Sequence, residues 1–310
     1  MSGVACIGEC MIELKQAGGG LYSRGFGGDT LNTAVYLARL GVAVDYITAL
    51  GDDPLSDEMV AGWLAEGVGT SKVARLAGKL PGLYLIATDA SGERRFFHWR
   101  ESAAARSLLD LPETESLLQS LSTYDLVYLS AITLSIYTES GRGRLLAALR
   151  EARRRGTRIA FDTNFRARGW PDLDIARRLF REAFETSDIA LASTEDLLPL
   201  YPGEDAEGLL AKIPGGEVVL KLAEPASLLR IAGALQPIEA EPMTAPVVDT
   251  TAAGDSFAAA YLAARLAGEP PVESARAGHR LAGVVVCHPG AIIPRSAMPA
   301  NSFPLRKVSS

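Results

Sequence analysis

The stretch of this chain with the clearest capacity for chemistry is residues 249–257, which read Asp-Thr-Thr-Ala-Ala-Gly-Asp-Ser-Phe. The apolar residues 246–248 before it predict a strand, and the alanine-rich run after it predicts a helix. Backbone N–H groups in such a small-residue turn can approach a ligand closely, and at a helix N-terminus they favour an anion. Asp255 adds a carboxylate to the same turn. An anion site with a base beside it is what phosphoryl transfer to a hydroxyl requires.

A second glycine-rich stretch lies near the other end of the chain, at residues 25–32. Its adjacent glycines let the backbone wrap a polyhydroxylated ligand, and Asp29 and Asn32 can accept from and donate to hydroxyls. Each stretch also has a purely structural interpretation. Residues 249–257 fit an ordinary strand-to-helix turn, and Asp29 or Thr30 fits the cap of the following helix. Short motifs have many chance matches, so the two stretches carry more weight together than apart.

Polar side chains also follow two predicted strands. The apolar strand 4–7 ends at Gly8 and Glu9, and the apolar strand beginning at residue 158 ends in Asp162, Asn164 and Arg166. Ligands of open α/β sheets sit at the carboxyl ends of the strands. We therefore expect the second group to face a cleft. Glu9 is either a site residue or a solvated loop acid.

The elements that position these residues alternate between strand and helix over most of the chain. This rhythm predicts an α/β fold of three layers with a mostly parallel sheet. An antiparallel pair at 227–231 and 235–239 follows the last parallel strand. The other predicted strands are 4–7, 45–50, 126–130, 158–166, 188–191 and 218–222; the predicted helices are 31–40, 56–66, 145–155, 172–186, 253–267 and 272–287, with a short one from 193.

A hairpin interrupts that rhythm, because residues 83–87 and 95–100 are strand-like and only the turn 89–93 separates them. With a short strand at 11–14 and a flexible glycine turn after it, the hairpin predicts a small β-sheet lid. Its aromatic face would cover a substrate, form a dimer contact, or both, since a small sheet cannot bury both faces alone. The predicted division is a main domain of 1–10, 28–78 and 105–298, a lid of 11–27 and 79–104, and a disordered tail of 299–310.

Composition limits the alternatives. The 310 residues suffice for one large domain with an excursion, and the net charge of −6 argues against broad nucleic-acid binding. The three cysteines form no disulfide framework, and the three histidines are scattered, which argues against a histidine metal site. No signal-like N-terminus or apolar run of membrane length is evident, so we expect a reducing cytoplasm and no membrane partner.

Residues 27–32 and 249–255 together resemble the two glycine signatures of the ribokinase-like (PfkB) carbohydrate kinase family. The resemblance covers nearly the whole chain, including the hairpin. It implies the three-layer ribokinase-like fold with its small β lid. Within the family, the chain is most similar to the kinases of a keto-deoxy sugar acid. The matching stretches are 8–13, 80–84, 92–94, 99–100, 162–166 and 290–295.

That resemblance implies ATP- and Mg²⁺-dependent phosphorylation of 2-keto-3-deoxygluconate at its terminal hydroxyl. Two alternatives remain open: a fructokinase or other neutral-sugar kinase of the same fold, and a catalytically idle sugar-binding regulator. In the implied mechanism, Asp255 takes the proton of the primary hydroxyl. The backbone N–H groups of Ala252, Ala253 and Gly254 hold the transferring phosphoryl group.

The substrate-binding residues that the resemblance implies are Gly28, Asp29, Thr30, Asn32, Tyr84, Arg100, Arg166 and Asp255. Tyr84 and Arg100 from the lid and Arg166 from the main domain would hold the acid end. Physical chemistry supports the arginines independently, because a planar guanidinium binds a carboxylate through two hydrogen bonds. The alternative is that both arginines are surface salt-bridge partners.

The nucleotide side departs from the family pattern. A loop of the form K-x-G-x-x-G reads Lys-Leu-Ala-Glu-Pro-Ala at 221–226, without either glycine, and Ala252 replaces a usual glycine. A magnesium motif of the form N-x-x-E begins instead with Ser193 and ends with Asp196, which could orient metal-bound water. A monovalent cation near Asp249 and residues 285–292, and a homodimer or higher homo-oligomer through the lid, are also implied. The implied nucleotide-binding residues are Asn164, Lys221, Ala223, Ala226, Ala252, Gly254 and Ala291.

Overall fold

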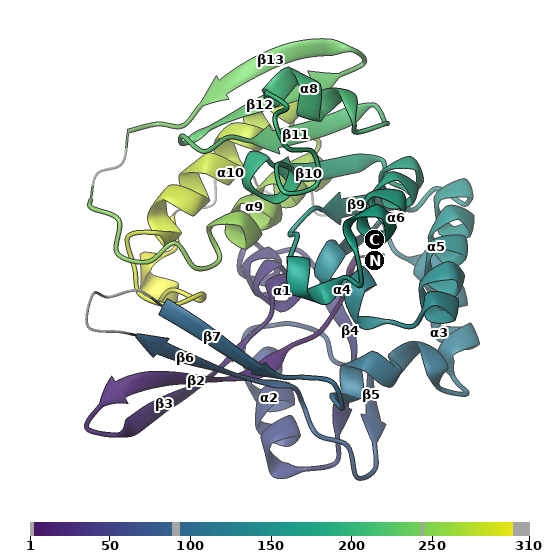
Figure 1. The fold of residues 1–310 in the computed structure, drawn as a ribbon, viewed down its shortest axis with the longest axis vertical. Helices are drawn as coiled ribbons and strands as arrows, with labels where there is room; N and C mark the ends of the chain where they lie inside the picture. The colour runs from purple at the N-terminus through teal and green to yellow at the C-terminus, as the bar shows by residue number, and fades with distance from the viewer. Residues whose placement is uncertain (1–2, 89–93, 243–244, 300–310) are drawn as a thin grey trace.

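The computed structural model describes residues 3–88, 94–242 and 245–299 (Figure 1). Within them, the large sheet has nine strands in the order β13-β12-β11-β10-β9-β8-β1-β4-β5. The strands from β11 to β5 in that order are parallel, and β12 and β13 are antiparallel, as the sequence predicts. Their bounds are β1 (Val4–Ile7), β4 (Val44–Gly51), β5 (Val73–Leu76), β8 (Leu126–Ser130), β9 (Arg158–Asp162), β10 (Ile189–Ser193), β11 (Glu217–Lys221), β12 (Ala226–Ile231) and β13 (Ala234–Glu239).

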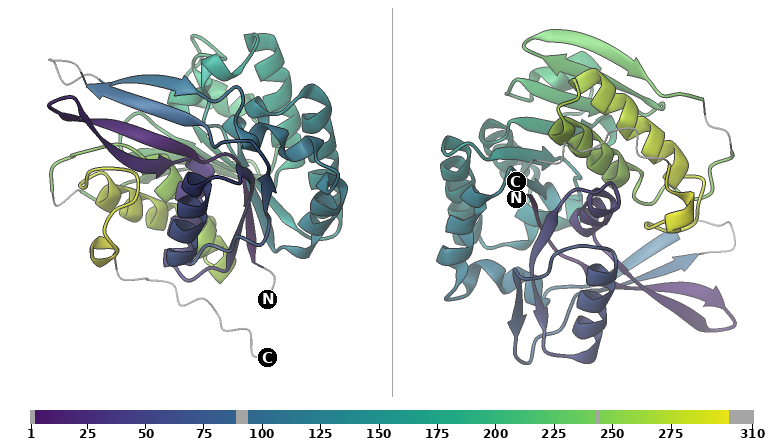
Figure 2. Two further views of the ribbon diagram at one scale, coloured as in Figure 1. Left: turned by 90° about the horizontal axis from the view of Figure 1, so that it is seen from below. Right: turned by 180° about the vertical axis from the view of Figure 1, so that it is seen from behind.

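Helices cover both faces of this sheet (Figures 1 and 2). On one face lie α1 (Asp29–Arg39), α2 (Pro54–Ala65), α9 (Ala253–Ala267) and α10 (Pro271–Val285). On the other lie α3 (Thr114–Ser120), α4 (Ala131–Ile136), α5 (Glu139–Arg154), α6 (Leu173–Thr186), α7 (Thr194–Leu197) and α8 (Ala206–Ala211). Short 3₁₀ helices are η1 (Ala104–Asp110), η2 (Leu121–Thr123), η3 (Ala167–Gly169) and η4 (Arg295–Ala297).

The strands build two separate cores because successive side chains point to opposite faces of a sheet. In β1, Val4 and Cys6 pack with α1 and α9, while Ala5 and Ile7 pack with α5 and α6. All four residues are buried. This arrangement confirms the predicted three layers.

The lid is a four-stranded sheet of order β3-β2-β6-β7, set apart from the main sheet (Figure 1). Its strands are β2 (Met11–Gly18), β3 (Leu21–Gly27), β6 (Leu83–Thr88) and β7 (Arg94–Trp99). Tyr84, Phe96 and His98 stack on one of its faces. The small sheet was expected, but β3 was not, because its residues followed a glycine run that indicated only a flexible turn. The predicted turn 89–93 and residues 300–310 of the predicted tail lie outside the described residues.

Two further expectations for the elements were wrong or incomplete. Residues 246–248 form no strand, and Val247 and Val248 are 50% and 58% exposed, because no strand pairs with them. Strand β5 and helices α3, α4 and α8 were not among the predicted elements. Among the described residues, no helix is long and apolar enough to cross a membrane.

Candidate active site

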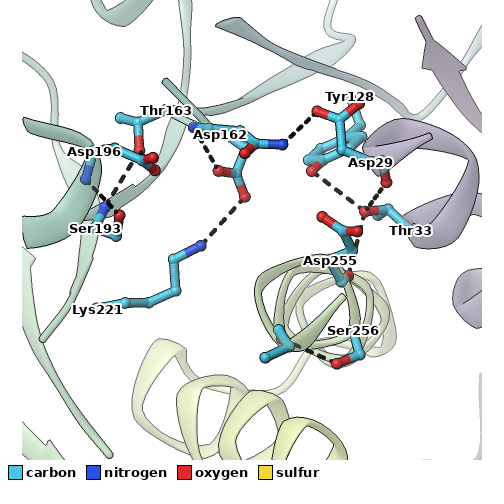
Figure 3. Close-up of polar contacts among 12 residues, drawn as sticks. Asp29, Thr33, Tyr128, Asp162, Thr163, Ser193, Asp196, Lys221, Asp255 and Ser256 are labelled. Atoms are coloured by element: carbon cyan, nitrogen blue, oxygen red, sulfur yellow. Dashed lines mark hydrogen bonds and ion pairs between the residues drawn. The ribbon is translucent and has the colours of Figure 1, made fainter. Parts of the chain in front are cut away.

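The two glycine-rich stretches meet where α1 and α9 begin. Asn32 donates a side-chain hydrogen bond of 2.8 Å to the Asp255 carboxylate. One residue further along α1, the Thr33 hydroxyl donates to the backbone carbonyl of Asp255 at 3.3 Å (Figure 3). Residues separated by most of the chain are therefore joined at one point, as the sequence predicts for a shared site.

The Asp255 carboxyl group has an unusual acidity. Burial raises its pKa to about 8, and the neighbouring carboxylates of Asp29 and Asp162 act in the same direction. The hydrogen bond from Asn32 and the positive charge of Lys221 oppose that rise. A base whose pKa lies near neutrality suits proton transfer from a hydroxyl group, because its conjugate acid is neither too strong nor too weak.

The turn before α9 is held in a strained backbone conformation. Ala252 has φ of 62° and ψ of 16°, the left-handed region that favours glycine. The N–H group of Ala253 donates to the carbonyl of Thr250 at 3.2 Å, so this predicted phosphoryl ligand is engaged within the turn itself. One Asp249 carboxylate oxygen stabilises the turn by accepting hydrogen bonds from the N–H and the hydroxyl of Thr251. The other Asp249 oxygen accepts from the N–H of Gly290, which brings together the two segments expected near a monovalent cation.

Polar groups at the ends of β9 and β11 complete the surroundings of Asp255. The Lys221 ammonium lies 3.4 Å from the Asp162 carboxylate, and Asn164 donates to the Asp29 carboxylate at 2.7 Å (Figure 3). Burial raises the pKa of Asp162, although the charge of Lys221 counteracts it. Asp162 and Asn164, two of the residues that the strand-end rule singled out, thus lie with Lys221 close to the Asp29 and Asp255 carboxylates.

Asp196 has a mainly structural set of contacts. Its carboxylate accepts from the Thr163 hydroxyl at 2.8 Å and from the Phe165 N–H at 3.0 Å. Ser193 caps α7 by accepting from the Asp196 N–H at 3.1 Å. Over the described ranges, no group of three or more His, Cys, Asp or Glu side chains could hold a metal ion. The expectation that Asp196 orients metal-bound water stays a prediction.

The lid supplies two of the predicted substrate ligands at its junction with the main domain. Arg100 forms an ion pair with Glu9, whose side chain is almost fully buried at the end of β1. Burial raises the pKa of Glu9 against the opposing effect of Arg100. The second Glu9 oxygen and the Arg100 Nε are buried without hydrogen-bonding partners in the part of the chain that the structure describes. Tyr84 donates to Glu13 at 2.5 Å and packs directly over Gly27.

Arg166 differs from Arg100 in its exposure. Its side chain is 61% exposed, and it contacts the Phe165 carbonyl and, at 3.4 Å, the Asp196 carboxylate. Both arginines therefore have carboxylate partners within the chain, as the salt-bridge alternative states. Arg100 is the less exposed of the two arginines, at 20% of its side chain, and its partner Glu9 is buried.

Four predicted ligands lie in positions that limit their roles. Thr30 is fully buried and its hydroxyl bonds Tyr46, so its side chain belongs to the core beneath the site and is not among the ligand-facing groups. Ala226 uses its N–H within the turn after β11, where it donates to the Glu224 carbonyl, and Ala223 is exposed in that turn. Ala291 accepts from the Tyr36 hydroxyl at 2.7 Å, beside α1.

Sequence reasoning missed two residues that organise the site. Thr33 links Asp29, Tyr128 and Asp255 through its hydroxyl, and its place four residues after Asp29 on α1 was the available signal. Glu13 holds Tyr84, and its inward direction could not be read from a strand whose pairing was unknown.

A model of the pfkB family of carbohydrate kinases matches residues 1–298. The chain belongs to this family. It is 45% identical over 306 residues to 2-dehydro-3-deoxygluconokinase of Dickeya dadantii (strain 3937), a match that covers 96% of this chain and 98% of that protein. The enzyme of the same name from Escherichia coli (strain K12) is 42% identical, with 96% and 99% covered.

Solved structures of pfkB kinases share the fold. A fructokinase with bound ATP from Xylella fastidiosa superposes with a TM-score of 0.81 at 23% identity, covering 97% of this chain and 96% of that one. A 2-dehydro-3-deoxygluconokinase from Thermotoga maritima also gives 0.81, at 22% identity, with 94% and 96% covered. At these identities the likeness establishes the fold alone.

Proposed function

We propose that this pfkB kinase transfers the terminal phosphoryl group of ATP to the terminal hydroxyl of 2-keto-3-deoxygluconate (2-dehydro-3-deoxygluconate), giving 2-keto-3-deoxy-6-phosphogluconate. The observation that carries the proposal is its 45% identity to a 2-dehydro-3-deoxygluconokinase over nearly the full length of both chains. The joining of Asp255 to Asn32 at the start of α9 supports it, because a base and an anion-favouring helix end then occupy one place.

In this mechanism Asp255 accepts the proton of the attacking hydroxyl while Asn32 fixes the carboxylate in place. Asp29, held by Asn164, accepts from further sugar hydroxyls. The N-terminal turn of α9 receives the transferring phosphoryl group through its backbone donors and helix dipole. Asp255 must be deprotonated to act, so turnover should rise with pH towards its raised pKa of about 8.

Magnesium would be held mainly by the nucleotide phosphates and by water. The Asp196 carboxylate is already engaged by Thr163 and Phe165, so this chain offers few direct ligands. Such sparse protein ligation is usual for Mg²⁺ that arrives with a nucleotide. When bound, the ion neutralises phosphate charge during transfer.

The acid end of the substrate would lie between the lid and the main domain. The unpartnered Arg100 Nε can donate to a carboxylate or keto oxygen, and the unpartnered Glu9 oxygen can accept from a hydroxyl. Exposed Arg166 can swing from Asp196 to the substrate. Closure of the lid over these groups would exclude water and limit wasteful hydrolysis of ATP.

A neutral-sugar kinase is the second candidate, and one observation favours it. Each of the two arginines already faces a carboxylate, Glu9 or Asp196, so neither pair presents a net positive charge to a substrate. A fructokinase of Klebsiella pneumoniae is also similar, at 29% identity over 302 residues.

A panel of sugars and sugar acids, assayed with ATP by coupled release of ADP, separates the candidates. We expect kcat/KM to be highest for 2-keto-3-deoxygluconate. Replacing Asp255 by Asn should lower kcat by about 10²–10⁴-fold while the far-ultraviolet circular dichroism is unchanged. Preference for fructose would reject the sugar-acid assignment, and near-native turnover of the variant would reject Asp255 as the base.

The same panel tests the role of Arg166. Charged hydrogen bonds of this kind contribute about 1.5–3 kcal/mol, so Arg166→Ala should lower kcat/KM for the sugar acid by about 10- to 150-fold. Use of a neutral sugar should change little. Equal loss on both substrates would show that Arg166 acts on something other than the carboxylate.

We further propose that the chain forms a homodimer through its lid. Apolar side chains of the lid are unusually open to solvent: Leu21 at 70%, Tyr22 at 48%, Phe96 at 43%, Phe97 at 47% and Trp99 at 58%. Among them, Phe97 and Trp99 are two residues apart on β7 and so share one face of the lid, and an exposed apolar face of this kind is typical of an interaction surface.

A further inference from the structure

We propose that Asp162 is a positioning residue: its carboxylate holds the Lys221 ammonium beside the first turn of α9, where the ammonium contacts the transferring phosphoryl group. The proposal rests on the kinase function above and deepens its nucleotide side. Lys221 would be the catalytic residue of the pair, and Asp162 would act only through it.

The geometry of the sheet sets this pair apart from a surface ion pair. Asp162 ends β9 and Lys221 ends β11, and β10 lies between them, so the lysine side chain must cross the end of a whole strand. The side chains are only 16% and 6% exposed for Lys221 and Asp162, respectively. A buried ammonium without a partner would be strongly destabilising, so the carboxylate determines where the amine can lie.

Besides Asp162, the Lys221 ammonium lies close to two residues of α9. Its Nζ lies 5.9 Å from the centre of the Phe257 ring. A Cβ atom on Gly254 would lie 3.5 Å from that Nζ and within 4 Å of no other group. Lys221 thus borders the same turn whose backbone was expected to receive the phosphoryl group (Figure 3).

The turn that follows Lys221 explains why a side-chain cation is needed here. Both glycines of the family pattern are absent, and the turn uses its own donors: the Leu222 N–H donates to Ala226 and the Ala226 N–H to Glu224. In α9 the Ala253 N–H is engaged as well. Backbone donors for phosphate are therefore fewer on both sides, and an ammonium with three donors can replace them.

The electrostatics of Asp255 give a signature that a merely structural pair would not have. Asp162 raises and Lys221 lowers the pKa of Asp255, so removing either charge alone should move that pKa in opposite directions. The other titratable groups near Asp255 are the same in wild type and in both variants, so they do not contribute to the difference in its pKa. The titratable groups that face Asp255 are Asp29 and Tyr36 of α1, Tyr84 of β6, Tyr128 of β8, Asp162 of β9 and Lys221 of β11.

The test compares Asp162→Asn and Lys221→Met with wild type in steady-state kinetics from pH 5.5 to about 9.5. We expect both variants to raise KM for ATP by at least about tenfold, as loss of a charged hydrogen bond does, with KM for the sugar within about twofold. The acid limb of kcat/KM for the sugar should move to lower pH in Asp162→Asn and to higher pH in Lys221→Met.

A double variant and a matched control make the test specific. If Asp162 acts through Lys221, Asp162→Asn should have no further effect on ATP use once Lys221→Met is present. Asp45→Asn removes another hydrogen-bonded aspartate, which accepts from the Tyr124 hydroxyl near the beginning of β4, at the opposite end of the parallel strands from Asp162 and Lys221. It should leave the KM values and the acid limb as in wild type.

Calorimetric binding of a non-hydrolysable ATP analogue separates this proposal from the proposed function. Weaker binding by Asp162→Asn and Lys221→Met supports the pair even if wild type phosphorylates no sugar acid. The proposal would be overturned if Lys221→Met bound the ATP analogue as tightly as wild type. It would also be overturned if the acid limbs of kcat/KM moved in the same direction in the two single variants, or if their effects on KM for ATP were additive in the double variant. Thermal unfolding of each variant establishes that it is folded before these comparisons are made.

Discussion

Ala252 shows how one residue can store strain at the proposed phosphoryl site. Its left-handed backbone, with φ of 62°, costs an alanine about 1–2 kcal/mol, a cost that glycine avoids. Glycine also gives the unfolded chain more freedom, which offsets about 0.4–1 kcal/mol of that gain. We therefore expect Ala252→Gly to raise the free energy of unfolding by about 0.5–1 kcal/mol, measured by urea denaturation.

The neighbouring alanine provides the control. Ala253 begins α9 in ordinary helical conformation, where glycine is the poorer residue. Ala253→Gly should lower the free energy of unfolding by up to about 1 kcal/mol. If both variants change stability in the same direction, backbone strain at Ala252 is not the explanation.

The contribution of Asp255 to the free energy of unfolding should fall as pH rises. Its folded pKa of about 8 lies above the ordinary value, so the native state binds this proton more tightly than the unfolded chain does. The resulting stabilisation is fully present below about pH 4 and is lost progressively as pH rises to about 8. An asparagine cannot lose a proton, so Asp255→Asn should gain stability over wild type across that window.

Urea denaturation at pH 5, 6.5 and 8 measures this difference. We expect the gain of Asp255→Asn to be larger at pH 8 than at pH 5. A gain that is constant with pH, or that shrinks towards pH 8, would contradict the raised pKa. The same variant should have a strongly reduced kcat, so the carboxylate would favour function at the expense of stability.

At the scale of elements, the site depends on how closely α1 approaches the end of β1. Gly28 precedes α1 with an extended backbone, so its conformation does not require glycine. The lack of space does require glycine, because a Cβ atom there would overlap the Glu9 carbonyl, which is backbone and cannot rotate away. Gly28→Ala should lower the free energy of unfolding by about 1–3 kcal/mol and weaken sugar binding.

Gly25 in β3 is the matched control for that change. The nearest atom to its added Cβ would be a Glu13 oxygen at 3.6 Å, an ordinary contact. Gly25→Ala should therefore alter the free energy of unfolding by no more than about 0.5 kcal/mol. Comparable losses in the two variants would show that glycine flexibility, and not the contact with Glu9, governs this region.

Elements with strong local patterns were predictable, and those defined by their partners were not. The helix expected at 253–267 is α9 with the same bounds, because its alanine run and its glycine stop are local signals. Residues 246–248 were as apolar as a strand, yet no neighbour pairs with them. β5 was missed for the opposite reason, since only its pairing with β4 makes it a strand.

The candidate site was predictable to the same degree. Strand ends and glycine turns indicated Asp29, Asn32, Asp162 and Asp255, which the fold brings together. The direction of the Thr30 side chain, and the partners of Arg100 and Arg166, depend on tertiary packing that no local pattern encodes. The long reach of Lys221 across β10 belongs to the same class.

At the scale of the whole molecule, the proposed dimer contact and a proposed substrate ligand lie next to each other on the lid. On β7, Phe97 and Trp99 point to the same face because they are two residues apart, and they are 47% and 58% exposed. The next residue, Arg100, is ion-paired with Glu9 on the main domain. A partner lid packed on this face would therefore steady the strand that carries Arg100.

We expect wild type to have about twice the 32.8 kDa chain mass in multi-angle light scattering, and Trp99→Asp to shift towards the monomer, because a charge cannot be buried cheaply in an apolar contact. Leu64→Asp on α2, where the leucine is 56% exposed, should leave the mass unchanged. If Arg100 depends on the dimer, Trp99→Asp should also raise KM for the sugar acid while KM for ATP stays constant. A monomeric wild type would reject the lid interface. If Trp99→Asp and Leu64→Asp both became monomeric, the cause would be general destabilisation and not loss of the contact made by Phe97 and Trp99.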